Sequence, residues 1–105
     1  MTDLNKLAES FKEVSELRNK QNSWDYDTVK YLKHCAGEVV EATEAYEEWT
    51  YCKDGTVSSL KEAFASELAD IMACVLIVAA KEHINIEEAL ASCLEKNCKR
   101  TENKR

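Results

Sequence analysis

The stretch that decides the fold is Glu67-Leu-Ala-Asp-Ile-Met-Ala-Cys-Val-Leu-Ile-Val-Ala-Ala80, which opens with two acids three residues apart and is then almost wholly apolar. A helix that is apolar on every side has to be buried by its neighbours. We therefore expect this segment to belong to the central helix of the fold. Ser58 or Ser59 is the expected N-cap of that helix, which should end near Glu82.

The composition of the whole chain favours helix. The 105 residues include no proline and only two glycines, Gly37 and Gly55, and they are rich in Ala, Leu, Glu and Lys. A chain of this length forms one domain, residues 1–105, and buries only about two thirds of the surface that its unfolded form exposes. We predict an all-α single domain that gains stability by oligomerisation.

Helical periodicity marks three further helices around the central one. The first is expected from about Asp3 to Lys20, with Thr2 or Asp3 as its cap and an apolar stripe of Leu4, Leu7, Phe11, Val14 and Leu17. The second should begin between Asp25 and Thr28 and end near Trp49. Its expected core stripe is Leu32, Cys35 or Ala36, Val39, Val40, Thr43 and Tyr46.

Turn and capping signals complete this outline. Lys53-Asp54-Gly55 is the strongest turn signal. Asn85 is the expected cap of a last helix, with Glu88 as its capping-box partner, and residues 101–105 should form a frayed tail. The chain is thus expected to fold as a four- to five-helix bundle with two central antiparallel helices.

Charge and cysteine content exclude several function classes. The formal net charge of -6 argues against a basic face that binds a nucleic acid polymer, and a polyanionic ligand would need a bridging cation. The five cysteines show no C-x-x-C spacing and follow no signal segment, so they are expected to be reduced, mostly buried thiols of a cytoplasmic protein. The longest apolar run, 71–80, is far shorter than the roughly 20 residues that span a bilayer.

Two acid pairs are the candidate chemistry of the chain. Residues three apart lie on one helix face, so Glu38 with Glu41, and Glu67 with Asp70, each present two carboxylates to one point. One such pair alone is weak evidence, because a solvated helix face explains it better. The same spacing recurs at Glu13/Glu16, Glu41/Glu44 and Glu44/Glu47.

The neighbours of these pairs favour a metal site. Glu67 and Asp70 share a helical column with Ala63, Cys74 and Ile77, so they border the expected core. Two antiparallel helices would aim all four carboxylates at one place. Oxygen donors without imidazole or thiolate suit Mg²⁺, or Mn²⁺, better than zinc.

Other catalytic architectures lack their required residues. A di-iron carboxylate bundle needs a Glu-x-x-His element, and neither His34 nor His83 has an acid three residues before it. No Ser or Cys stands out with a His and an acid as partners for nucleophilic catalysis. No glycine-rich loop is present to bind phosphates in the manner of a P-loop.

Three motifs resemble a known family. They are Gly37-Glu38-Val39-Val40-Glu41-Ala42-Thr43-Glu44, Glu67-Leu68-Ala69-Asp70, and Ile86-Glu87-Glu88-Ala89-Leu90 leading to Asn97-Cys98-Lys99-Arg100. Over about Trp24 to Arg100 the chain resembles the all-α nucleoside triphosphate pyrophosphohydrolases, the MazG-like and dCTPase-like group. MazG proper usually has two consecutive acids at the position where this chain has Gly37-Glu38. The dCTPase-like members have Gly-Glu there, as this chain does. This departure from MazG proper leaves the identity of the general base open.

The resemblance implies a function and a site. It implies a homodimer or homotetramer in which Glu38, Glu41, Glu67 and Asp70 hold magnesium. The implied reaction converts an NTP or dNTP and water to the monophosphate and pyrophosphate, in the manner of nucleotide-pool house-cleaning enzymes. Glu38 or Glu41 is then the expected general base, with attack at the α-phosphorus.

Six further residues are candidates for substrate binding. Asn97 and Arg100 match a C-terminal polar pair that contacts phosphates in relatives, although a surface helix end explains them equally well. His34 and Lys30 precede Glu38 on one helix face and could reach a phosphate, although an exposed polar face explains them better. Trp24 and Trp49 have flat faces that suit a nucleobase, and core packing is the competing explanation for both.

Two other functions fit parts of the sequence. A non-catalytic helical interaction or regulatory module with an acidic face accounts for the size and the charge, but not for two acid pairs beside apolar columns. A second alternative keeps the fold and the metal and changes the substrate to a phosphoribosyl-ATP-like nucleotide.

Overall fold

The computed structural model describes residues 3–51 and 57–103, and four α-helices account for most of them. They are α1 (Leu4–Asn22), α2 (Thr28–Tyr51), α3 (Val57–Lys81) and α4 (Ile86–Asn103). No strand occurs within these two ranges, so the prediction of an all-α fold is confirmed. The expected turn at 53–55 lies outside the described residues.

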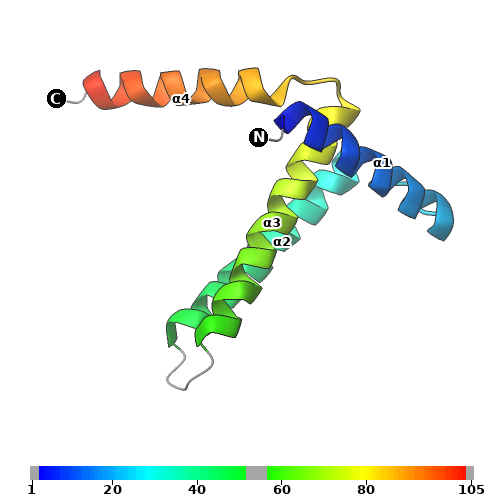
Figure 1. Cartoon of the computed structure of the whole chain (residues 1–105), viewed down its shortest axis with the longest axis horizontal. Coiled ribbons are helices and arrows are strands. Elements are labelled where there is room, and N and C mark those ends of the chain that lie inside the picture. Colours follow the sequence, from blue (N-terminus) through cyan, green and yellow to red (C-terminus); the bar gives the residue numbers. More distant parts are fainter. Residues whose placement is uncertain (1–2, 52–56, 104–105) are drawn as a thin grey trace.

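The helices α2 and α3 form an antiparallel pair, and α1 crosses α3 near its C-terminal end (Figure 1). The central position expected for 67–80 is confirmed, because α3 packs against both α1 and α2. Ala8 of α1 and two residues of α3, Leu76 and Ala80, form a buried cluster. Leu7, Phe11 and Ile86 pack around it, so this cluster also anchors the start of α4.

Side-chain caps define the helix ends. Asp3 accepts a hydrogen bond from the backbone N–H of Asn5, and Asn85 Oδ1 accepts one from the N–H of Glu88, so both expected caps are observed. The Asp27 carboxylate accepts a hydrogen bond from the Lys30 N–H at the start of α2. The expectation for α3 is wrong, because this helix begins at Val57, before both candidate serines.

The contact face of α2 differs from the expected one. Tyr31 and Ala42 are buried, and the half-buried residues beside them on this face are Cys35, Glu38, Ala45 and Trp49. The predicted stripe is largely exposed: Leu32, Val39, Val40 and Tyr46 are each about half accessible to solvent. That prediction fails because small and polar side chains of α2 pack on α3, which turns the apolar stripe outward.

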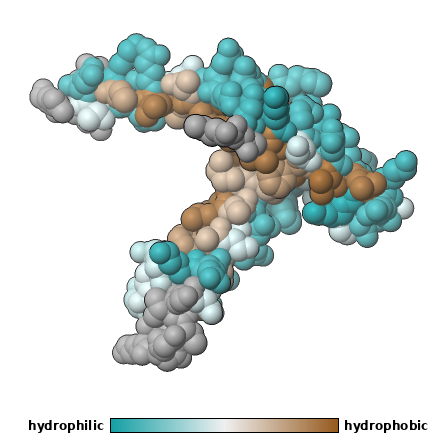
Figure 2. Space-filling view, in the orientation of Figure 1, coloured by the Kyte–Doolittle hydropathy of each residue, from teal (hydrophilic) through white to brown (hydrophobic). Residues whose placement is uncertain are grey.

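The helix α4 leaves the rest of the molecule after its first turn. Every residue from Glu87 to Glu102 is exposed, and α4 contacts α1 near its start (Figure 1). The helix continues to Asn103, past the expected beginning of the frayed tail. An open angle therefore separates α4 from the pair formed by α2 and α3 (Figure 2).

Two sequence expectations about apolar residues change with the structure. Cys74 is buried and Cys35 half-buried, but Cys93 and Cys98 are exposed, so most of the described thiols are not buried. By length and composition Ser59–Lys81 is apolar enough to cross a membrane, a longer stretch than the run 71–80. The same stretch carries the acids of the candidate site and packs against α1 and α2, as expected of a core helix.

Candidate metal and nucleotide site

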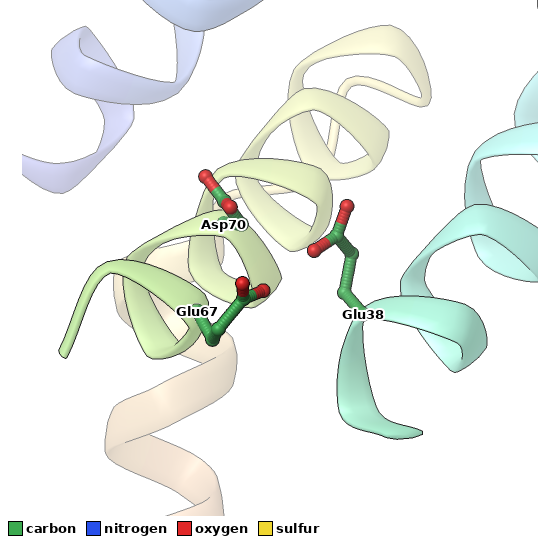
Figure 3. Close-up of side chains that lie close together, drawn as sticks. All are labelled: Glu38, Glu67 and Asp70. Atoms are coloured by element: carbon green, nitrogen blue, oxygen red, sulfur yellow. The ribbon is translucent and has the colours of Figure 1, made fainter. Parts of the chain in front are cut away.

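Three of the four predicted acids converge between α2 and α3. Glu38 reaches from α2 toward Glu67 and Asp70 of α3 (Figure 3). One carboxylate oxygen from each lies within 4.8 Å of the others. The arrangement follows from the local sequence, because Glu38 lies on the α2 face that contacts α3, while Glu67 and Asp70 are one turn apart on α3.

The electrostatics of this cluster are unfavourable without a cation. Burial raises the pKa of Glu67, and the negative charges of Glu41, Glu38 and Asp70 raise that pKa further. Glu38 Oε2 and Glu67 Oε2 are buried and have no hydrogen-bond partner among the described residues. Buried polar atoms are rarely left unpaired, so these two oxygens are suited to ligating an ion.

The donor set fits a hard divalent cation. Three carboxylates supply oxygen ligands, as magnesium and manganese prefer, and leave coordination positions for water or substrate phosphates. Glu41 is exposed and does not belong to the group of three. It lies one helical turn after Glu38 on α2, and its negative charge contributes to the raised pKa of Glu67.

His34 holds one side of the cluster. Its Nε2 lies 2.9 Å from Glu38 Oε1, one helical turn away on α2. The Glu38 side chain is 13% exposed and the His34 side chain 51% exposed, so the imidazole forms the border between the acids and solvent. His34 therefore orients the Glu38 carboxylate from its solvent side.

A cavity of about 250 Å³ leads away from the acids toward α1. Glu38 and Asp70 lie on its wall, together with residues of α1, α2, α3 and the connection between α1 and α2. The remaining lining residues are Ser15, Arg18, Asn19, Trp24, Tyr26, Tyr31, His34, Ala73, Cys74 and Ile77. The cavity thus joins a carboxylate cluster to aromatic and hydrogen-bonding side chains, a combination that small-molecule sites commonly have.

A buried polar network closes the inner side of this cavity. The hydroxyls of Ser15 and Tyr31 share a hydrogen bond, and Asn19 Nδ2 donates to the Tyr31 hydroxyl at 3.0 Å. Ser15 is 6% exposed. One sequence signal could have indicated this network. Ser15 lies four residues after Phe11, so it is a polar residue on the otherwise apolar side of α1.

Aromatic rings line the outer side. Tyr26 contacts Tyr31 with ring centroids 5.2 Å apart, and Trp24 lies 6.1 Å from Tyr26. Trp24, Tyr26 and His34 also border a second, open hollow of about 560 Å³ that includes Lys30 and Lys33. Of the sequence candidates, Trp24, His34 and Lys30 therefore lie near the acids. Sequence reasoning missed Arg18, Asn19 and the two tyrosines.

The other three sequence candidates lie elsewhere. Trp49 packs against Phe64 and Tyr46 toward the far end of α2, with centroid distances of 5.9 Å to each. Asn97 and Arg100 are exposed on the protruding part of α4, and Asn97 Nδ2 donates to the Cys93 carbonyl. Neither residue lines a cavity that includes an acid of the cluster.

Comparison with known proteins identifies the family. Residues 26–104 match the family model of the MazG nucleotide pyrophosphohydrolase domain, which covers most of the chain and all three converging acids. Searches of curated proteins and of solved structures gave no match. The all-α fold, the acid cluster and this match agree, and the chain belongs to the MazG nucleotide pyrophosphohydrolase family.

Proposed function

We propose that this protein is a magnesium-dependent nucleoside triphosphate pyrophosphohydrolase that converts an NTP or dNTP to the monophosphate and pyrophosphate. The observation that carries the proposal is the convergence of Glu38, Glu67 and Asp70 with two buried, unpaired carboxylate oxygens. Membership of the MazG family supports the same reaction class. A role in nucleotide-pool house-cleaning, in the cytoplasm and as a homo-oligomer, is part of this proposal.

The three clustered acids would hold the metal, with Glu41 at their edge as a fourth donor or as the base. A magnesium ion held there would supply positive charge to offset that of the triphosphate. Glu38 is already engaged by His34, whereas Glu41 is exposed beside the cluster. We therefore assign Glu41 to accept the proton of the water that attacks the α-phosphorus, with pyrophosphate as the leaving group.

The surroundings of the acids suit the rest of a nucleotide. Trp24 and Tyr26 offer ring faces to a base, and Asn19 offers an amide at the inner end of the cavity. Arg18 and Lys30 supply positive charge near the phosphates from two sides. Trp49 packs with aromatic neighbours instead, so we assign base stacking to Trp24.

The decisive experiment measures products. The purified protein is incubated with MgCl₂ and a panel of ribo- and deoxynucleoside triphosphates, and pyrophosphate is quantified against orthophosphate. Release of pyrophosphate with monophosphate, lost on chelation of the metal and in Glu38→Gln and Asp70→Asn, supports the proposal. Glu62→Gln is the matched control, since Glu62 is an exposed acid on α3, the helix that carries Asp70.

Two results would contradict the proposal. Turnover that persists in both variants would separate the reaction from the acid cluster. Absence of turnover with every nucleotide would favour a non-catalytic interaction module.

A further inference from the structure

The two oxygens of the Glu38 carboxylate have different surroundings. Oε1 lies 2.9 Å from His34 Nε2. Oε2 is buried and has no hydrogen-bond partner among the described residues, and one oxygen of the carboxylate points toward Glu67 and Asp70 (Figure 3). An ionised carboxylate only accepts hydrogen bonds, so the imidazole is the donor in this contact. One oxygen of Glu38 is therefore occupied by His34, and the other is left for an ion.

The His34 ring is held in place from two sides. His34 and Glu38 are four residues apart on α2, so their side chains share one helix face. Tyr26 packs against the imidazole with its edge, with ring centroids 6.4 Å apart and ring planes at 75°. Tyr26 in turn contacts Tyr31, which is buried. The donor that faces Glu38 Oε1 is thus positioned by packing, although half of the His34 side chain is accessible to solvent.

The two acids of α3 are not engaged in this way. No ion pair within residues 3–51 and 57–103 involves Glu67 or Asp70. Asp70 is exposed, and Glu67 keeps a buried oxygen without a hydrogen-bond partner in the same two ranges. Glu38 is therefore the acid of the cluster whose coordination mode is restricted by a neighbouring side chain.

Magnesium and calcium differ in the number of carboxylate oxygens that they use. Magnesium requires an octahedron of oxygens at about 2.0–2.1 Å and usually keeps several waters, so one oxygen per carboxylate is enough. Calcium takes about six to eight oxygens at about 2.3–2.6 Å and often binds both oxygens of one carboxylate. A carboxylate with a single free oxygen thus satisfies magnesium but gives calcium fewer ligands than it can use.

We propose that His34 makes the acid cluster select magnesium or manganese over calcium, because it keeps Glu38 a one-oxygen ligand. His34 is a positioning residue in this assignment, since it acts through Glu38 and does not contact the ion. Removal of a side chain that orients a metal ligand typically changes metal affinity by about 10- to 100-fold. The assignment rests on one part of the proposed function, namely that the three acids bind a divalent cation.

A direct role of His34 as a ligand fits the geometry less well. Its Nε2 faces Glu38 Oε1, and His34 does not belong to the group whose ligand atoms lie within 4.8 Å of one another. Hard cations also prefer oxygen to imidazole nitrogen. The imidazole therefore lies outside the ligand set.

The first test measures metal preference without a nucleotide. Binding of Mn²⁺ is followed by the electron paramagnetic resonance signal of the free ion, and Mg²⁺ or Ca²⁺ is added to displace it. Wild type should bind Mg²⁺ more tightly than Ca²⁺. In His34→Ala the preference for Mg²⁺ over Ca²⁺ should fall by about tenfold or more, because Glu38 gains a second free oxygen.

Two further variants separate the hydrogen bond from other effects of the substitution. His34→Gln keeps an N–H donor four residues before Glu38 and should restore most of the preference. Lys33→Ala shortens the exposed side chain next to His34 and should match wild type. His34 is 51% exposed, so the helical circular dichroism of its variants should equal that of wild type.

Several results would overturn the proposal. An unchanged preference in His34→Ala, or an equal loss of affinity for Mg²⁺ and Ca²⁺, would show that His34 does not discriminate between the ions. A His34→Gln variant that behaves like His34→Ala would show that the N–H donor is not what matters. A wild type that binds none of the three ions would overturn the assignment as well.

The second test identifies the proton on the imidazole. The chain has two histidines, His34 and His83, so His34→Gln assigns the signals of ¹⁵N-labelled histidine. In long-range ¹H–¹⁵N spectra at pH 8, His34 Nε2 should carry the proton both without metal and with Mg²⁺. Loss of this proton on addition of Mg²⁺ would make His34 a ligand and would overturn its role as a positioning residue.

Neither test depends on turnover, so the two proposals fail separately. If wild type selects Mg²⁺ but releases no pyrophosphate from any nucleotide, the proposed function fails and the role of His34 stands. If wild type releases pyrophosphate but His34→Ala keeps the full preference for Mg²⁺ over Ca²⁺, the role of His34 fails and the proposed function stands.

Discussion

One carboxylate oxygen of Glu38 on α2 lies within 4.8 Å of one of Glu67 on α3, and each residue keeps a second oxygen buried without a hydrogen-bond partner among the described residues. Two like charges are thus held together where solvent is scarce. Such an arrangement costs folding free energy unless a proton or a cation neutralises it. The stability of the chain should therefore report on the charge of this cluster.

Neutralising Glu67 should stabilise the metal-free protein. Burial and neighbouring negative charge raise the pKa of Glu67 above 4.5 in the folded state. The stabilisation that its protonated form contributes is fully present below the ordinary pKa and is lost as the pH rises through the raised pKa. In EDTA at pH 8, Glu67→Gln should therefore unfold at a higher urea concentration than wild type. This advantage should shrink at pH 4, and Glu62→Gln should show no such pH-dependent gain.

Magnesium should make the wild type more stable than variants that lack one of the clustered acids. A cation that binds the folded state stabilises it in proportion to the logarithm of its concentration above Kd. Addition of MgCl₂ should raise the melting temperature of wild type by several degrees, an effect of roughly 1–3 kcal/mol at saturating metal. Asp70→Asn should lose the increase while keeping its helical signal. An undiminished increase in this variant would place the binding site elsewhere.

Helix positions and the convergence of Glu38, Glu67 and Asp70 followed from the sequence more reliably than the faces of the helices. Asp3, Asn85 and the apolar run after Asp70 are local signals, and the structure agrees with them. The face of α2 depends on its partners. Its strongest apolar stripe, with Val39 and Val40, is exposed in the single chain, while Glu38 and Ala42 contact α3. Periodicity identifies an apolar stripe, but it does not specify which face of the helix packs on a neighbour.

The cavity was out of reach of sequence reasoning for a related reason. Its inner side pairs Ser15 of α1 with Tyr31 of α2, residues brought together by the crossing of the helices rather than by local spacing. Neither residue belongs to a motif. The angle at which α1 crosses α3 depends on tertiary packing around Ala8 and Leu76, which periodicity does not specify.

Removing one hydroxyl of this buried pair should destabilise the fold. Tyr31→Phe leaves Ser15 and Asn19 without their shared partner, and Ser15 is buried, so a loss of about 1–3 kcal/mol is expected. Ser15→Ala alone should cost less, because Asn19 still donates to Tyr31. In urea unfolding the double variant should lose less than the sum of the two single variants, as expected for side chains in contact. Additive losses would show that the two hydroxyls act independently.

The two tryptophans should separate ligand binding from stability. Trp24 borders the cavity and is 51% exposed, whereas Trp49 packs against Phe64. In calorimetric titrations with a non-hydrolysable triphosphate, Trp24→Ala should weaken binding by about 1–3 kcal/mol while shifting the melting temperature little. Trp49→Ala should lower stability by several kcal/mol, a typical cost of truncating a packed tryptophan, with the affinity of the folded protein unchanged. The reverse pattern would assign the base to Trp49.

A pair of asparagines contributes to the attachment of α4, beside the hydrogen bond from the Leu4 N–H to Glu87 Oε1 and the apolar contact of Ile86. Asn5 Nδ2 donates to Asn85 Oδ1 at 2.8 Å, and Asn5 Oδ1 accepts from the Ile86 N–H, so α1 binds the first turn of α4 directly. Asn85→Ala removes both this acceptor and the N-cap, and it should lower the free energy of unfolding by about 1–2 kcal/mol. Asn85→Asp keeps an oxygen in that place and should remain within about 0.5 kcal/mol of wild type in urea unfolding. Equal free energies of unfolding in the two variants would show that α4 is held by its apolar contacts, such as that of Ile86 with the Ala8 cluster.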